Sequence, residues 1–386
     1  MKRVLEHLFA IIIFSFLFFF SPSICGAIYD PLSASNNKVG IHILNPNEID
    51  RAADLVNSSG GDWGYITVPL RADDRDREKW LKFFQACKEK HLIPIIRLAT
   101  VMNSHGWKQP DLYDSLDTAN FLNDMPWSTK NRYIVVYNEP NHGEEWGGVV
   151  DPADYARILK YTSLIFKQRN PDFFILPAGF DAAAPSNLPA HESLYNFVYK
   201  MYSFHPDIFE HIDGWTSHSY PNPGFSGSPA EGHKMSISSF NHELNFLGRF
   251  TNKKLPVFIT ETGWNQEKLG EEKTANFFQQ AFNNIWSNNR VVAVTPFLLM
   301  AGQGSFKKFS FLKPDGSESK VYFTLKNMNK LSGEPILEEE TLFAQILGTE
   351  DYHQETTSEF QGFTRELNLS LEKWKKILSW LWYTKN

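Results

Sequence analysis

The sequence predicts an α/β fold, a (β/α)8 TIM barrel followed by a C-terminal extension. Short apolar runs alternate with amphipathic stretches between residues 39 and 330. Such runs are typical of parallel strands whose two faces are both buried. Eight of them occupy about 290 residues, and a barrel of this type typically takes about 250 residues before insertions. The expected strands are Val39–Leu44, Tyr65–Leu70, Ile93–Ala99, Tyr133–Tyr137, Phe173–Ala178, Ile212–Ser217, Val257–Thr260 and Val291–Leu299.

Helices are expected between these strands. The clearest start is Asp151-Pro152, a capping residue followed by proline at the first helical position. A doubly wound open sheet is the alternative fold, but it requires a glycine-rich phosphate loop after a strand, and we find none in the sequence. We therefore expect no cofactor. The expected helices are Asp76–His91, Asp151–Arg169, Leu194–Ser203, Ile237–Phe250 and Glu271–Asn288.

Residues 1–27 are typical of a secretory signal peptide. Two basic residues precede the apolar run Leu8–Phe20, and small residues up to Ala27 offer a cleavage site. The run has about 13 residues, fewer than the roughly 20 that a membrane-spanning helix needs. We therefore expect a secreted, extracellular protein. The alternative is an uncleaved segment that tethers the protein to a membrane.

The composition restricts the classes of molecule that the protein is expected to bind. The formal net charge of -6 argues against nucleic acid and suits a protein that acts on a neutral ligand. Aromatic residues make up 15% of the chain, with 11 tryptophans, and flat rings often line sugar subsites. Loss of residues 1–27 would leave Cys87 as the only cysteine, which excludes an intrachain disulfide. No His, Asp and Glu cluster has metal-ligand spacing, so no metal is expected.

Residues 28–330 are expected to form the catalytic domain, and residues 331–386 a polar linker with an amphipathic C-terminal helix. The apolar residues Leu367, Leu371 and Trp374 fall on one face of that helix. This face could pack on the barrel or make a peripheral contact with a membrane surface. We expect a monomer.

Two of the expected strands end in a glutamate. Glu139 ends the fourth, directly after Asn138, and Glu261 ends the seventh, while His218 and Tyr220 follow the sixth. Functional groups of such barrels lie at the carboxyl ends of the strands. Because a pair of carboxylates is the minimal apparatus for hydrolysing a glycosidic bond, these positions predict a glycosidase site.

Residues 39–330 resemble the retaining barrel glycosidases of glycoside hydrolase clan A. The motif Asn138-Glu139-Pro140-Asn141 is similar to family 39, and Thr260-Glu261-Thr262-Gly263-Trp264 is similar to family 17, with family 5 as a further likeness. Clan members carry Asn-Glu at the end of strand four and a nucleophilic Glu at the end of strand seven. The resemblance therefore implies that Glu139 is the acid/base and Glu261 the nucleophile.

The same resemblance implies roles for the neighbouring polar residues. Asn138 is expected to hydrogen-bond the sugar 2-hydroxyl, and Tyr220 to donate to the Glu261 carboxylate. His218 shares that network or binds sugar. Arg71 on the second strand could orient Glu261, as a strand-two arginine does in several clan families, and Arg97 on the third strand is an equal rival.

Four further residues are expected near the cleft. His42 on the first strand faces the barrel mouth. Trp264 follows the catalytic Glu and is expected to be a sugar platform. Trp146 belongs to the loop Asn141–Val150, which is expected to build the cleft rim. Many clan members carry a Trp at the end of strand eight, and here Phe297 stands nearest to that place.

The sequence thus predicts a secreted retaining β-glycosidase that acts on a poly- or oligosaccharide. One alternative is a non-hydrolytic carbohydrate-binding barrel, against which both intact glutamates argue. The other is a transglycosylase that uses the same covalent intermediate, because access of water to that intermediate decides the outcome.

Overall fold

The computed structural model describes residues 28–104, 106–302 and 304–338. The expected signal peptide and the C-terminal helix lie outside the described residues. Within the described ranges, no helix is both long and apolar enough to cross a membrane.

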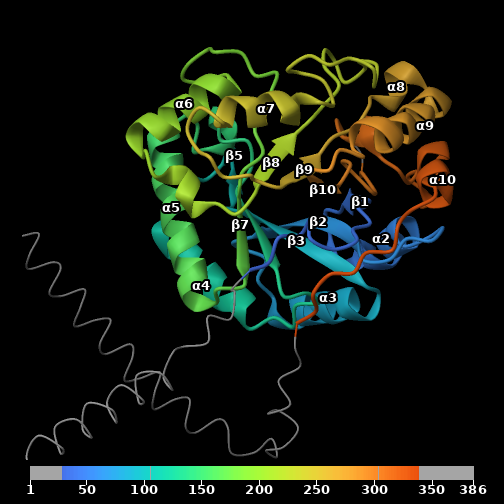
Figure 1. Cartoon of the computed structure of the whole chain (residues 1–386), viewed down its shortest axis with the longest axis horizontal. Coiled ribbons are helices and arrows are strands. Elements are labelled where there is room, and N and C mark those ends of the chain that lie inside the picture. Colours follow the sequence, from blue (N-terminus) through green and yellow to red (C-terminus); the bar gives the residue numbers. More distant parts are fainter. Residues whose placement is uncertain (1–27, 105, 303, 339–386) are drawn as a thin grey trace, which may run out of the picture. The chain divides into compact units, whose positions relative to one another are not determined.

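Eight parallel strands form the centre of the molecule in two sheets (Figure 1). The isolated bridges Val39–Val294 and Asp181–His218 join the edges of these sheets. The strands therefore follow one another around a ring in chain order, and the predicted (β/α)8 arrangement is confirmed. One sheet holds β1 (Gly40–His42), β2 (Gly64–Arg71), β3 (Leu92–Ala99), β6 (Arg132–Val136) and β7 (Phe173–Pro177), and the other holds β8 (Trp215–His218), β9 (Val257–Glu261) and β10 (Val291–Val294).

Helices surround the strands (Figure 1). All five expected helices are present with shifted ends, and the last of them continues from α9 into a π-helical turn at Ala281–Ile285. Four helices, α2, α4, α8 and α10, were not expected from the sequence. The helices are α2 (Ile49–Val56), α3 (Arg77–Glu89), α4 (Leu112–Asn123), α5 (Pro152–Arg169), α6 (Leu194–Phe204), α7 (Ser239–Leu247), α8 (Gln266–Leu269), α9 (Glu271–Gln280) and α10 (Lys320–Asn327).

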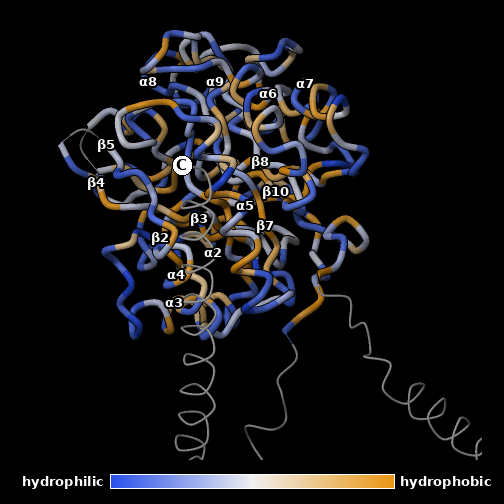
Figure 2. Tube along the Cα trace, turned by 90° about the vertical axis from the view of Figure 1, so that its left-hand side faces the viewer, coloured by the Kyte–Doolittle hydropathy of each residue, from blue (hydrophilic) through white to orange (hydrophobic). Residues whose placement is uncertain are grey.

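The amino-terminal half of the barrel interior is apolar. Tyr65, Ile95, Tyr133, Phe174 and Phe258 point inward from five strands and pack together. A second, larger cluster fills the layer between the strands and the helices, and Figure 2 shows hydrophobic residues concentrated along the inner elements and hydrophilic residues on the outside. Polar inward-facing residues are therefore gathered near the carboxyl ends of the strands.

Residues 331–338 run along the amino ends of the strands. The backbone N–H of Lys130 donates to the Ile336 carbonyl at 2.9 Å. Arg132, at the start of β6, pairs with Glu338 at 2.9 Å. The described part of the expected extension therefore packs against the barrel at the end opposite to the polar residues.

Candidate active site

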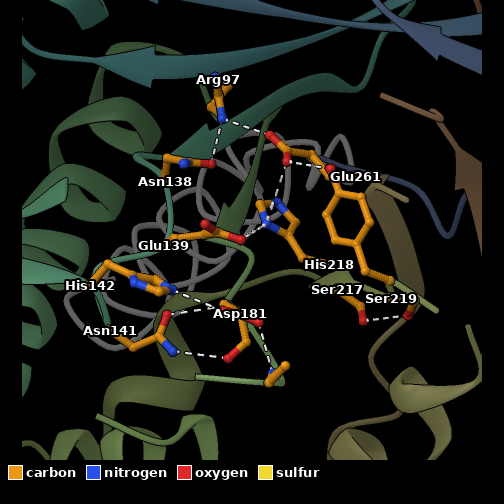
Figure 3. Close-up of polar contacts among 12 residues, drawn as sticks. Arg97, Asn138, Glu139, Asn141, His142, Asp181, Ser217, His218, Ser219 and Glu261 are labelled. Carbon is orange, nitrogen blue, oxygen red and sulfur yellow. Dashed lines mark hydrogen bonds and ion pairs between the residues drawn. The ribbon is translucent and has the colours of Figure 1, made fainter. Parts of the chain in front are cut away.

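The two glutamates face one another at the carboxyl end of the barrel (Figure 3). Side-chain oxygens of Glu139 and Glu261 and a ring nitrogen of His218 all lie within 4.8 Å of one another. Glu139 has a φ of +30°, which is uncommon for a residue with a side chain, and its N–H donates to the Gly179 carbonyl at 3.1 Å. The turn after β6 thus holds Glu139 in a fixed, sparsely populated conformation beside a cleft of about 590 Å³.

Glu261 is held by cationic and hydroxyl donors. Its Oε1 accepts from Arg97 at 2.9 Å, and its Oε2 accepts from the Tyr220 hydroxyl at 3.1 Å. Burial raises the pKa of Glu261, but the charges of the nearby His218 and Arg97 and the Tyr220 hydrogen bond outweigh it and lower the pKa. Glu261 is therefore ionised near neutral pH, as a nucleophile needs to be.

Arg97, and not Arg71, contacts Glu261, which decides between the two rivals. Arg71 is exposed at the end of β2, and its guanidinium pairs with Asp73 at 2.6 Å while its side chain lines the cleft. Arg97 points into the barrel from β3 and also donates to the side-chain oxygen of Asn138. It therefore ties the ends of the fourth and seventh strands of the barrel together.

Glu139 receives its hydrogen bond from His218. Nδ1 of His218 lies 2.7 Å from Oε1 of Glu139, and the imidazole is 1% exposed. Burial lowers the pKa of His218, but the Glu261 charge and the hydrogen bond to Glu139 outweigh it and raise the pKa. Gly179 packs on this ring so closely that a Cβ there would lie 2.1 Å from it. A side chain at position 179 would displace His218.

His42 lies beneath Glu261 and does not line the cleft. Its Nδ1 is 3.9 Å from Oε1 of Glu261, its ring packs edge-on against Phe297 at 5.0 Å, and its side chain is fully buried. Burial lowers the pKa of His42 to about 3, so the imidazole is neutral. His42 was expected to face the barrel mouth, but its ring is buried behind the cleft lining, and neither ring nitrogen has a hydrogen-bond partner among the described residues.

Two tryptophans expected to bind sugar are buried, and both expectations are wrong. Trp264 is 1% exposed, donates to the Gly227 carbonyl at 2.8 Å and packs on Phe278. Trp146 is fully buried and donates to Asp154 at 3.1 Å. Burying a large indole in the helix layer removes more apolar area from water than the cleft could cover. The aromatic residues that line the cleft are Trp107, Tyr137, Tyr220, Phe225, Phe297, Phe306 and Phe309.

Several polar residues of the cleft carry no signal in the sequence. His142 lines the cleft together with Asp181, and its Nε2 lies 3.0 Å from Oδ2 of Asp181 (Figure 3). The Nδ1 atoms of His142 and His191 are 2.9 Å apart. These residues come from loops after different strands, so only the folded chain shows that they meet. Glu145 also lines the cleft, as expected for the rim loop Asn141–Val150.

Comparison with known proteins adds a family match. Residues 100–324 match the family model described as glycosyl hydrolase catalytic core. No curated protein matches the chain by sequence.

Solved structures with similar folds are glycoside hydrolases. A family 39 β-xylosidase from Caulobacter crescentus has a TM-score of 0.57 at 14% identity, covering 80% of this chain and 75% of its own. A family 5, subfamily 18 protein from Streptomyces cattleya, solved with GlcNAc, has a TM-score of 0.56 at 17% identity, covering 77% and 80%. A family 39 glycoside hydrolase from Bacteroides cellulosilyticus WH2 has a TM-score of 0.52 at 15% identity and 78% coverage of this chain, which spans 65% of that protein.

Proposed function

Because the chain belongs to the glycosyl hydrolase catalytic core family, we propose that it is a secreted retaining β-glycosidase. Its substrate is an oligo- or polysaccharide, and it cleaves the glycosidic bond by double displacement. The acidic chain and the cleft with aromatic residues suit a neutral glycan. The apolar run near the N-terminus supports export.

The observation that carries the proposal is the close pair of carboxyl groups in contrasting surroundings. Retaining enzymes place these groups about 5–5.5 Å apart, and inverting enzymes about 6.5–9.5 Å apart to make room for a water molecule. The oxygens of Glu139 and Glu261 lie within 4.8 Å, which favours retention.

In the first step, Glu261 attacks the anomeric carbon while Glu139 gives its proton to the leaving oxygen. The glycosidic bond breaks and a glycosyl ester forms on Glu261. In the second step, Glu139 takes a proton from water, which attacks the anomeric carbon and releases Glu261 as carboxylate. Each carboxyl ends in its starting state, so the cycle is closed.

The surrounding residues have distinct tasks in this scheme. Arg97 and Tyr220 keep Glu261 charged and oriented, because both donate to its oxygens. His218 orients Glu139 through Nδ1. Asn138 presents its amide to the sugar 2-hydroxyl, a contact that strengthens toward the transition state. These contacts argue against a non-hydrolytic sugar-binding barrel, which needs no such support for two carboxylates.

Stereochemistry tests the proposal. Residues 28–386 would be assayed on a panel of aryl β-glycosides, and proton NMR would identify the anomer that is released first. We expect the β-anomer. The Glu261→Ala variant should be inactive, and added azide should restore turnover and give an α-glycosyl azide, because azide takes the place of the missing carboxylate. First release of the α-anomer, or a β-glycosyl azide, would contradict the assignment.

A further inference from the structure

The cleft holds a third carboxyl group close to the catalytic pair. Glu145 is half-buried and lines the cleft together with Asn138 and Glu139, whereas its neighbour Glu144 is exposed to solvent. The scheme for double displacement gives Glu145 no part. A half-buried carboxyl in a ligand cleft loses hydration, so it requires a partner that compensates for this loss.

A rigid turn directs Glu145 into the cleft. The 3-10 turn Gly143–Glu145 is closed by hydrogen bonds from Gly143 to the Ala190 carbonyl at 2.7 Å and from Glu145 to the His142 carbonyl at 3.1 Å. Trp146 comes next and is fully buried, so it anchors the loop in the helix layer. The chain then turns away through Gly147, whose φ of +71° suits glycine. The carboxyl is therefore placed by the fold and not by a flexible loop.

The partner of Glu145 is the amide of Asn138. The two side chains are hydrogen-bonded, and the oxygen of that amide already accepts from Arg97. Arg97 can only donate, so the amide oxygen faces Arg97 and the amide nitrogen is the group left to face Glu145. The amide nitrogen carries two hydrogens, which leaves one N–H for a ligand in the cleft.

Ion pairing does not account for the position of Glu145. The charged groups that face it are Glu139, Glu261, Arg97 and His142. The first two repel a carboxylate, while Arg97 pairs with Glu261 and His142 pairs with Asp181. Burial and then the Glu139 charge raise the pKa of Glu145 to about 7, although Arg97 and the Asn138 amide act in the opposite direction.

We propose that Glu145 is a positioning residue that, with Arg97, fixes the Asn138 amide so that its free N–H meets the hydroxyl at carbon 2 of the reacting sugar. This inference rests on the proposed glycosidase function. Arg97 and Glu145 hold the amide from opposite ends and restrict its rotation. Glu145 thereby acts on the reaction through Asn138, without contact with the reacting atoms.

The test asks whether the effect of Glu145 on the rate depends on the 2-hydroxyl of the substrate. The fastest substrate among 4-nitrophenyl β-glucoside, β-xyloside and β-galactoside is paired with its 2-deoxy analogue, and kcat/KM is measured for both. Glu145→Gln should lose about tenfold on the parent glycoside and less than about threefold on the 2-deoxy analogue, because only the parent uses the oriented N–H. Glu144→Gln makes the same chemical change on the exposed neighbour and should alter neither value.

A double-mutant cycle separates orientation from folding. In an Asn138→Ala background, Glu145→Gln should cause no further loss of preference for the 2-hydroxyl, because its target is gone. Equal losses on both substrates, or the same loss with and without Asn138, would overturn the inference. Absence of turnover by the unmodified protein on all substrates would instead overturn the proposed function.

Discussion

The surroundings of Glu261 and of Glu139 differ, although both groups lie beside His218. Glu261 is 8% exposed and its two oxygens accept from Arg97 and Tyr220. The Glu139 side chain is 21% exposed, and within the described ranges its carboxyl has one hydrogen-bond partner, His218. A group that must stay charged is enclosed by donors, and a group that must exchange protons with substrate and water is left open. The contrast suits the two different steps that we propose for these identical side chains.

Loss of the enclosed carboxylate should have the largest effect. Glu261→Gln removes the charge that forms the glycosyl ester, so kcat should fall by at least about 10⁴-fold on every substrate, whatever its leaving group. The loss of kcat is measured as steady-state rates on a series of aryl glycosides whose leaving groups differ in pKa. A loss confined to poor leaving groups would assign Glu261 the role of acid.

Loss of the open carboxyl should depend on the substrate. Glu139→Gln should cost about 10²–10⁴-fold on glycans, whose leaving oxygen needs a proton, and should spare the first step on activated aryl glycosides. Pre-steady-state release of the aryl group isolates that step. If activated substrates lost first-step rate as much as a polysaccharide, the contrast between the two sites would be wrong.

Arg97→Met should weaken the enclosure of Glu261 and cost about 10²-fold in kcat/KM. The ionised form of Glu261 is stabilised by the Arg97 charge, so without it the pKa of Glu261 rises and the acid limb of the kcat/KM profile moves to higher pH. Arg71→Met is the matched control, because that guanidinium pairs with Asp73 and should leave the limb in place. An unmoved limb in Arg97→Met would contradict the electrostatic role.

Tyr220→Phe should give the smallest change of the series, about tenfold in kcat/KM, because it removes one of the donors to Glu261 and keeps the ring. The ring packs on Phe225 and Phe309, so the melting temperature should change little. Thermal unfolding and rates measured together would show whether the hydroxyl acts on the site alone. A large fall in melting temperature with unchanged kcat/KM would mean that it acts on stability.

The fold could be predicted because its strands carry a strong local signal. Continuous apolar runs such as Tyr133–Tyr137 have few other interpretations. The resemblance to glycoside hydrolases is confirmed by the family match, and the similar solved structures share the fold. Three of the missed helices, α2, α8 and α10, have eight residues or fewer, but α4 has 12. α4 starts with a capping box at Asp111 and Asp114, a signal that could have revealed it. Its polar sequence hid the buried face.

The site was predictable only where residues stand at strand ends. Glu261 and His218 end their strands, and Glu139 and Tyr220 lie two or three positions after theirs, so the barrel itself brings the four together. Trp264 also follows a strand, yet its ring turns outward into the helix layer. The direction of a side chain in a loop depends on packing that the sequence does not display.

Contacts between loops could not be predicted from the sequence, for a different reason. His142 and Asp181 meet across 39 positions of sequence, and their loops have no periodicity from which a register could be inferred. Such pairs are set by the tertiary path of the loops.

The two ends of the described chain meet far from the cleft. The Tyr29 N–H donates to the Asn131 side chain at 3.1 Å, and the Tyr29 hydroxyl accepts from the N–H of Ile336 at 3.3 Å. Asn131 precedes β6 and Glu139 follows it, which places a strand of about 16 Å between this junction and the Glu139 carboxyl. A resin, a fluorophore or a fused scaffold attached beside either Tyr29 or Ile336 would therefore leave the cleft open to long polymers.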